Sequence, residues 1–366
     1  MMSFSQWGNA LYSGEKSYAV VPKRKILLSA TGVVVLLALI LTLILGVNRS
    51  IEFTGGSQFT LVGVSNTSQQ LAYDALTSSG LGSNARVSNV GADGIRVQTD
   101  SLTSEQTATV RDALAQAYGV SATDVQSSSI GPSWGKDVTN KAIQSLLIFL
   151  GLVGLLMAAY FRSWSMSVAA LVALLHDVII TIGFFAVVRV EVSPATVIGF
   201  LTILGYSLYD TVVVFDKVRE LTKDIHDQRR YTYAELVNLA VNQTLVRSIN
   251  TSVVALLPVG AILIIGSLLL GAGTLTDISL ALFVGMIAGT YSSIFIASPL
   301  LVAIEERRGR TREHDEAVAA ERARRARKAA SSTTEETRSG VVTAAPGMPG
   351  QHLGRQAQPK RKKNKR

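Results

Sequence analysis

Three charged side chains interrupt long apolar stretches of this sequence, namely Asp177, Asp210 and Arg247. A charged residue inside a membrane-crossing helix commonly costs about 2.5–3.5 kcal/mol on insertion scales, so it usually faces the protein interior and has a partner or a task. Carboxylates at such positions often bind and release protons. These residues are therefore the first candidates for function.

Asp210 and Arg247 are predicted to reach similar depths, because their helices run in opposite directions and both residues lie towards the inner end. Each helix also has a face of small or polar residues at intervals of three to four. The first face contains Thr196, Gly199, Thr202, Tyr206 and Asp210, and the second contains Arg247, Asn250, Thr251, Val254 and Pro258. Two polar faces that each carry one member of a possible charge pair indicate a hydrated path between these helices.

Spacing leaves two interpretations of the Asp210–Arg247 pair open. The two groups can form a fixed ion pair that specifies helix packing, although burying such a pair is often no better than neutral for stability. Alternatively, Asp210 gains and loses a proton as the helices rearrange, with Arg247 favouring its ionised form in one state only.

His176 and Asp177 are adjacent in the third apolar stretch, on a face that also contains Ala169, Ala173 and Thr181. We expect these two residues and Tyr206 to support the pathway or the packing rather than to carry the proton themselves. A lone histidine titrates near neutral pH but does not make a metal site. The chain has no cysteine, which excludes disulfides, thiolate metal sites and thiol redox chemistry, and we expect neither a metal nor a cofactor.

The last apolar stretch has a small or polar residue at every fourth position. These residues are Asp277, Ala281, Gly285, Gly289 and Ser293. A stripe of this kind lets another helix approach closely, so it is predicted to be a packing surface for a partner helix.

The elements that position these residues are predicted to be six membrane-crossing helices. Of the 366 residues, 48% are apolar and 17% are charged, below the roughly 25% charge of a typical soluble domain. Segments long enough to cross a bilayer are predicted at residues 26–47, 140–161, 166–188, 194–216, 247–270 and 276–303. The expected fold class is therefore a membrane all-α bundle of six transmembrane helices.

Basic residues predict the orientation of the bundle. They flank the first span at residues 23–25 and recur in the predicted loop 217–246, so both segments, with residues 1–25, are expected to be cytoplasmic. The tail 305–366 holds most of the +9 net charge and is expected to be cytoplasmic. Its first part, around residues 313–328, is expected to be helical and the rest disordered. It is predicted to lie near anionic lipid, with a contact to the ribosome as the alternative.

Residues 48–136 have the composition of a small soluble domain on the outer side of the membrane. Their pattern predicts the order β-α-β-β-α-β, which is typical of a ferredoxin-like α+β domain. The charges in this segment are scattered, so we expect a binding or shape-changing module rather than an enzyme.

Several motifs make the chain similar to the SecF family of protein-export membrane proteins. Residues 205–220 read GYSLYDTVVVFDKVRE, close to the family's GYSxNDTVVVFDRIRE, and include Gly205, Asp210 and Asp216. Further matches are Phe53-Thr54-Gly55-Gly56, His176-Asp177, the segment 247–252 and the segment 291–295. Two departures are Tyr209, where the family has Asn, and Glu52, where it has Asp.

The resemblance implies a fold of the resistance-nodulation-division type in the cytoplasmic membrane, in which SecF pairs with SecD to complete twelve spans. It implies binding to the SecYEG channel and use of the proton-motive force to assist preproteins after SecA has started their export. Asp210 is then the proton-binding carboxylate and Arg247 its partner, with Asn250 and Thr251 lining the path.

Two alternatives to a proton-driven translocase subunit follow from the same sequence. One is an exporter of small molecules or lipids with the same fold, since a fold does not fix a function. Exporters of this type normally carry both halves in one chain, which six spans do not supply. The other is a passive scaffold that stabilises the translocase, which predicts that Asp210 and Arg247 are dispensable.

Overall fold

The computed structural model describes residues 4–81, 84–91, 93–266 and 273–339, and it divides into a unit 1–315 and a unit 316–366. The described residues contain six helices long and apolar enough to cross a membrane. They are α2 (Arg24–Leu45), α6 (Pro132–Phe161), α7 (Trp164–Val188), α8 (Pro194–Thr222), α9 (Tyr233–Ile264) and a last helix in three parts. The last helix consists of α10 (Gly273–Ser292), the π-helical turn η4 (Ser293–Ala297) and α11 (Ser298–Glu305).

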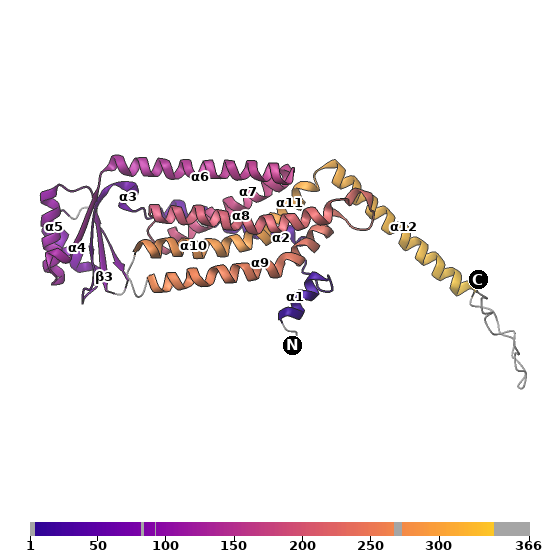
Figure 1. Cartoon of the computed structure of the whole chain (residues 1–366), viewed down its shortest axis with the longest axis horizontal. Helices are drawn as coiled ribbons and strands as arrows, with labels where there is room; N and C mark the ends of the chain where they lie inside the picture. Colours follow the sequence, from indigo (N-terminus) through magenta and orange to yellow (C-terminus); the bar gives the residue numbers. More distant parts are fainter. Residues whose placement is uncertain (1–3, 82–83, 92, 267–272, 340–366) are drawn as a thin grey trace, which may run out of the picture. The chain divides into compact units, whose positions relative to one another are not determined.

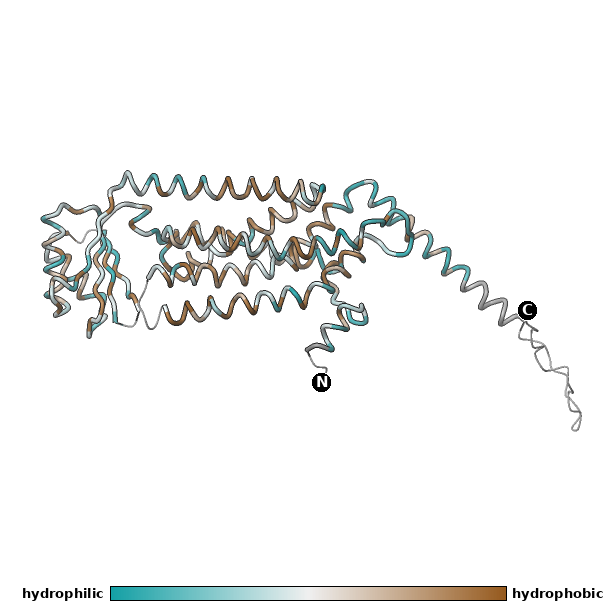
Figure 2. The backbone as a smooth tube through the Cα atoms, in the orientation of Figure 1, coloured by the Kyte–Doolittle hydropathy of each residue, from teal (hydrophilic) through white to brown (hydrophobic). Residues whose placement is uncertain are grey.

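The six helices lie side by side, and their hydrophobic residues concentrate along this bundle (Figures 1 and 2). About half of the residues in α7 and in the last helix are buried, whereas α2 and α6 have few buried residues. In α9 the buried residues lie in the first two thirds, from Tyr233 to Ser252. Exposed apolar side chains cover α2, including Val33, Leu36, Leu43 and Ile44. In a bilayer these peripheral faces meet lipid or another protein. The chain is a multi-pass membrane protein whose interior is built from α7, α8 and α10.

A four-stranded antiparallel sheet lies at one end of the bundle (Figure 1). Its order is β2-β3-β1-β4, formed by β1 (Gly56–Leu61), β2 (Arg86–Val90), β3 (Gly94–Thr99) and β4 (Gln126–Ile130). The helices α4 (Gln69–Ser78) and α5 (Ser104–Tyr118) pack on the sheet around a core that includes Phe59, Leu61, Val97 and Leu114. Thr103 and Gln106 form a reciprocal capping box that begins α5.

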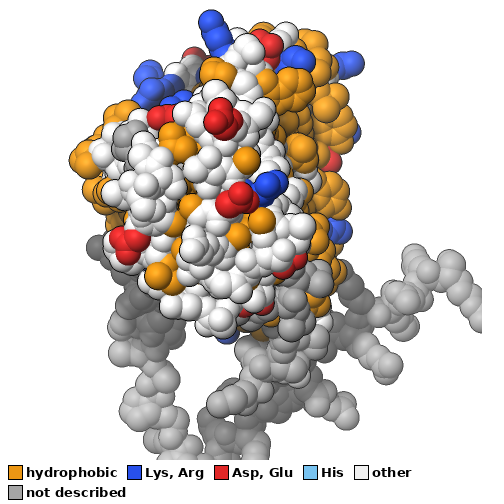
Figure 3. Space-filling view, turned by 90° about the vertical axis from the view of Figure 1, so that its left-hand side faces the viewer, with side chains coloured by type: hydrophobic (Ala, Val, Ile, Leu, Met, Phe, Trp, Pro, Cys, Tyr) orange, Lys and Arg blue, Asp and Glu red, His pale blue; other side chains and the backbone are white. Residues whose placement is uncertain are grey.

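The surface of this domain is mostly uncharged, with isolated acidic and basic side chains (Figure 3). The domain also contains a short 3-10 turn, η1 (Ala122–Asp124), before β4. Over the part of this face that the structure describes, acidic and basic side chains are interspersed among uncharged ones.

Two glycines of the segment 53–56 join the sheet domain to the bundle. The short helix α3 (Ile51–Thr54) ends at Gly55, whose φ of 75° is in the left-handed region that glycine favours. A Cβ on Gly55 would lie 2.8 Å from Pro132 Cα, and one on Gly56 would lie 2.4 Å from Thr99 O. The Phe53-Thr54-Gly55-Gly56 motif therefore holds the start of α6 and strand β3 close to the end of α3.

Helices α8 and α9 are longer than the hydropathy pattern predicts. Helix α8 continues to Thr222, and α9 begins at Tyr233 with a capping box formed by Thr232 and Glu235. The connection between them is thus residues 223–232, with a short turn η2 (Ile225–Asp227), rather than 217–246. Hydropathy detects where a helix enters lipid, but a helix continues into water wherever its caps and contacts allow. Consequently Arg247 lies near the middle of α9.

The N-terminal helix α1 (Phe4–Tyr12) and the segment after it pack against α9. Asn242 accepts a hydrogen bond from the Tyr18 amide at 2.6 Å and donates one to the Tyr18 carbonyl at 3.0 Å. Asn238 holds the Val21 amide in the same way at 3.0 Å. Helix α12 (Gly309–Ser339) follows the bundle. Residues 267–270 of the predicted fifth span and 340–366 of the predicted tail lie outside the described residues.

Candidate functional site

Asp210 lies in the middle of α8 and is 3% exposed. One carboxylate oxygen accepts a hydrogen bond from Ser248 Oγ on α9 at 2.6 Å, and the other accepts a short one from Ser293 Oγ on η4. Three helical elements therefore converge on one carboxylate. Among the described residues, its hydrogen-bond partners are two hydroxyl groups rather than a cation.

Arg247 does not contact Asp210. Its side chain is on the exposed surface of α9, and among the described residues it forms no ion pair. Asn250 is also exposed and Thr251 is half-buried, with its hydroxyl bonded to the Arg247 carbonyl at 2.9 Å. The reason is helical geometry: Ser248 and Ser252 point into the bundle, which turns residues 247, 250 and 254 outward. The predicted pathway residues thus divide between a buried carboxylate and an outward-facing group on α9.

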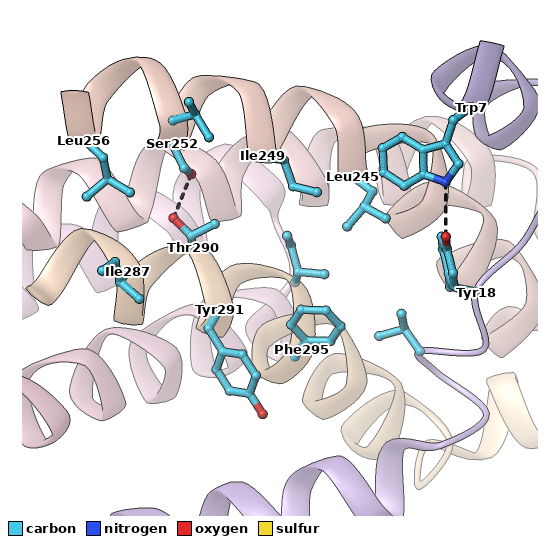
Figure 4. A pocket seen from close by; sticks show the side chains of 13 residues that line it. Trp7, Tyr18, Leu245, Ile249, Ser252, Leu256, Ile287, Thr290, Tyr291 and Phe295 are labelled. Carbon is cyan, nitrogen blue, oxygen red and sulfur yellow. Dashed lines mark hydrogen bonds between the residues drawn. The ribbon is translucent and has the colours of Figure 1, made fainter. Parts of the chain in front are cut away.

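Ser252 extends the polar contacts of Asp210 along α9. Its hydroxyl donates to the Ser248 carbonyl at 2.8 Å, lies 2.7 Å from Thr290 Oγ1 and accepts a hydrogen bond from Tyr206 at 3.2 Å. Ser252 and Thr290 also line an apolar cavity of about 540 Å³ between α9 and α10 (Figure 4). Trp7 and Tyr18, joined by a 3.1 Å hydrogen bond, border the same cavity.

A second buried carboxylate, Asp177, lies in the middle of α7 and is 1% exposed. His176 Nδ1 lies 3.0 Å from one of its oxygens, and Ser207 Oγ donates to the other at 2.5 Å. Ser207 is one turn before Asp210 on α8, so the two carboxylates contact neighbouring turns of the same helix region.

The small-residue stripe packs inside the chain rather than against a partner, which corrects the prediction from its spacing. A Cβ on Gly285 would lie 2.2 Å from Ile203 Cδ1, and one on Gly289 would lie 2.9 Å from Ser207 Cβ. Ala281 faces Gly199 in the same way. The stripe brings α10 against α8, and this close approach places Ser293 on Asp210.

Asp277 begins the stripe at the sheet-domain end of the bundle. It accepts a 3.0 Å hydrogen bond from Ser193, the residue that caps α8. Gly205 and Tyr209 are on the exposed side of α8, and Asp216 accepts a 3.1 Å hydrogen bond from Tyr160 near the other end. None of these groups reaches Asp210 through a recorded bond. Within the described ranges, no three His, Asp or Glu side chains are placed to hold a metal ion.

Sequence reasoning assigned no role to Ser207 or Ser248, and it treated Ser293 as a packing residue. Each is one of many serines, and its function depends on which face of its helix turns inward. The available signal is periodicity: Ser248 and Ser252 are four residues apart, and Gly289 and Ser293 likewise.

Comparisons with known proteins identify the family of the chain. The family described as "Protein export membrane protein SecD/SecF, C-terminal" matches residues 109–307. The chain is similar to the Protein translocase subunit SecF of Streptomyces coelicolor, with 45% identity over 88% of this chain and 86% of that protein. It is 40% identical to the SecF subunit of Mycobacterium tuberculosis over 92% of this chain and 77% of that one.

A solved structure has the same fold. The crystal structure of SecDF from Thermus thermophilus, described as a translocon-associated membrane protein, matches with a TM-score of 0.72 and 33% identity. The match covers 80% of this chain but 39% of that one, so the chain spans about two fifths of the SecDF protein. These similarities, over most of the chain, show that it belongs to the SecD/SecF family of protein-export membrane proteins, as a SecF-type subunit of the protein translocase.

Proposed function

We propose that this subunit uses proton binding at Asp210 to assist late steps of preprotein translocation, as one half of a complex with SecD. The observation that supports this proposal is the pair of hydroxyl partners on a carboxylate buried in the middle of the bundle. Ionisable side chains that face the interior of a membrane helix bundle commonly belong to proton pathways.

The hydroxyl partners suit both protonation states of Asp210. When it is ionised, Ser248 and Ser293 both donate to it. When it is protonated, it donates to a serine, which must then turn its own hydrogen elsewhere. Ser293 has such an alternative acceptor, because the Thr290 carbonyl lies 3.1 Å from its Oγ. A fixed ion pair would stabilise only the ionised form of Asp210, whereas the two serine hydroxyls can hydrogen-bond to both the ionised and the protonated form.

Contacts at the sheet-domain end offer a way to transmit a change in α8 to the outer domain. Glu191, in the loop before α8, pairs with Arg96 of β3 at 2.6 Å and accepts from Gln98 at 2.6 Å. Val192 forms a bridge with Arg49 at the entry to the domain. A tilt or shift of α8 would therefore pull on β3 and couple proton binding to movement of the domain.

SecD is proposed to cover the outward side of α8 and α9. This side contains Tyr209, which is 60% exposed, together with Arg247 and Asn250. Arg247 is costly to leave facing lipid, so a partner helix with an acceptor on this surface would satisfy it. The SecDF match leaves more than half of that chain for such a partner.

The wider setting is proposed on the same basis. The basic residues 23–25 and 217–230 favour a cytoplasmic location for both termini, which places the sheet domain outside the cytoplasmic membrane. The strand order β2-β3-β1-β4, with two helices packed on the sheet, supports a ferredoxin-like topology for that domain. Contacts with SecYEG, with SecA-driven preproteins, and of the basic tail with lipid or ribosome belong to this proposal.

Translocation into inverted membrane vesicles tests the function. With Asp210→Asn, the stimulation of preprotein import by a proton gradient should disappear, while ATP-driven import remains. Asp216→Asn is the matched control, because it makes the same chemical change six residues further along α8. Full gradient stimulation in Asp210→Asn vesicles that contain an intact complex would support a passive scaffold instead.

A further inference from the structure

We propose that His176 and Asp177 form a second proton-binding site within the membrane helices, separate from Asp210. The site binds one proton, shared between an imidazole and a carboxylate. Its part in translocation rests on the proposed function, whereas proton binding itself is argued from the geometry of the two side chains and their neighbours.

The hydrogen bonds of Asp177 define the empty state of the site. Ser207 Oγ donates to one oxygen at 2.5 Å, and His176 Nδ1 lies 3.0 Å from the other. An ionised carboxylate accepts and does not donate, so this arrangement assigns the imidazole hydrogen to Nδ1. The His176 Nε2 atom then has a free lone pair.

His176 also faces a cavity that is lined mainly by apolar side chains, with Thr31 and Tyr291 as its other polar residues. The cavity has a volume of about 690 Å³ and lies between α2, α7 and α10. Within the described part of the chain, no hydrogen bond to Nε2 is formed. The His176 ring lies 6.3 Å from that of Tyr291, whose hydroxyl is 3.2 Å from Thr31 Oγ1.

Uptake of one proton would change the net charge of the pair. With a neutral imidazole, the pair carries one negative charge and is more than nine-tenths buried. A proton bound at Nε2 turns the pair into imidazolium and carboxylate with no net charge. This state avoids an uncompensated buried charge. The titratable groups on the surrounding helices are Tyr291 on α10 and Asp210 on α8, and α2 supplies the uncharged Thr31.

The two proposed proton-binding sites both lie beside the interface between α8 and the last membrane helix, which is called the α8–α10 seam below. Ser207 and Asp210 are one turn apart on α8, and Gly289 and Ser293 face them one turn apart on the other helix. A Cβ on Gly289 would lie 3.5 Å from Asp177 Oδ2, so the seam is closed around the second carboxylate. Two negative charges at neighbouring levels of a low-dielectric seam repel each other, so proton binding at one site affects the other.

Infrared difference spectroscopy across a pH titration tests this proposal, with the full chain and its SecD partner in lipid nanodiscs. The wild-type spectrum should show a proton-dependent change in the imidazole ring mode and in the carboxylate modes of Asp177. Asp177→Asn should remove the carboxylate change, and His176→Gln should remove the ring change. Ser207→Ala keeps both titratable groups and should shift the frequency of the Asp177 mode.

The outcomes separate this inference from the proposed role of Asp210. A titration spectrum that is the same in wild type, Asp177→Asn and His176→Gln would overturn the second site and leave the proposal for Asp210 intact. Loss of the Asp177 and His176 signals, with no change in Asp210→Asn, would support the second site and contradict proton binding at Asp210. If Asp177→Asn does not assemble, the frequency shift in Ser207→Ala and the ring mode in His176→Gln decide the question.

Discussion

Ser293 donates a hydrogen bond to Asp210 from a π-helical turn that interrupts the last membrane helix. A π turn contains an extra residue and occurs frequently at functional sites. Here the turn spans Ser293–Ala297 and presents the Ser293 hydroxyl to the carboxylate on α8. The turn and the small residues before it together bring a donor to a buried acid.

Removing this donor should destabilise the bundle measurably. Ser293→Ala leaves one oxygen of Asp210 without its partner, and an unsatisfied buried polar group costs about 1–3 kcal/mol. Thermal unfolding of the purified protein should show the loss. Ser298→Ala is the control, because the Ser298 hydroxyl is buried with no hydrogen-bond partner among the described residues. Equal stability of the two variants would mean that the Ser293 bond contributes little.

Close packing of α10 on α8 predicts a sharp size limit at Gly285. A Cβ there would lie 2.2 Å from Ile203 Cδ1 and 2.8 Å from both Ile203 Cγ atoms. Ile203 is β-branched and stiff, so Gly285→Ala should cost about 1–3 kcal/mol through overpacking. Denaturant unfolding measures this. At Gly205, where an added Cβ meets no described atom within 4 Å, the same change should be neutral or stabilising by up to about 1 kcal/mol.

A bulky residue at Gly205 should instead disrupt the complex with SecD. Gly205→Leu places a large side chain on the outward surface of α8 beside Tyr209, where we expect the partner helix to pack. Co-purification of tagged SecD should fall strongly. Gly151→Leu is the matched control on α6, because a Cβ at Gly151 also meets nothing within 4 Å. Equal recovery of SecD with both variants would place the interface elsewhere.

The ion pair between Arg96 and Glu191 should hold the outer domain to the bundle. Both side chains are less than one-fifth exposed, so Glu191→Ala leaves Arg96 without its carboxylate in a partly buried site. Hydrogen exchange in β3 and in the loop before α8 should become faster. Glu220→Ala, which breaks the exposed Lys217–Glu220 pair, should leave exchange unchanged in those segments. Unchanged exchange in Glu191→Ala would argue against this route of coupling.

The sequence predicted the six apolar helices and the small sheet because both depend on local periodicity and composition. It also identified Asp177 and Asp210, since a charge in an apolar stretch stands out. It did not predict that Arg247 points away from Asp210. Residues two positions apart lie on nearly opposite faces of a helix, so a small error in which face turns inward reverses the direction of a side chain. It assigned the stripe from Asp277 to Ser293 to a partner helix, whereas α8 of the same chain fills it. Helix-to-helix pairing is a tertiary property that spacing within one helix does not contain.

The most direct test of the account is proton flux in proteoliposomes that contain this chain reconstituted with SecD. Under an imposed proton gradient and membrane potential, the wild-type pair should conduct protons, and Asp210→Asn should abolish the flux. Asp216→Asn should conduct like the wild type. Flux that persists undiminished in Asp210→Asn, with the complex shown to be assembled, would contradict the central claim that Asp210 binds the transported proton.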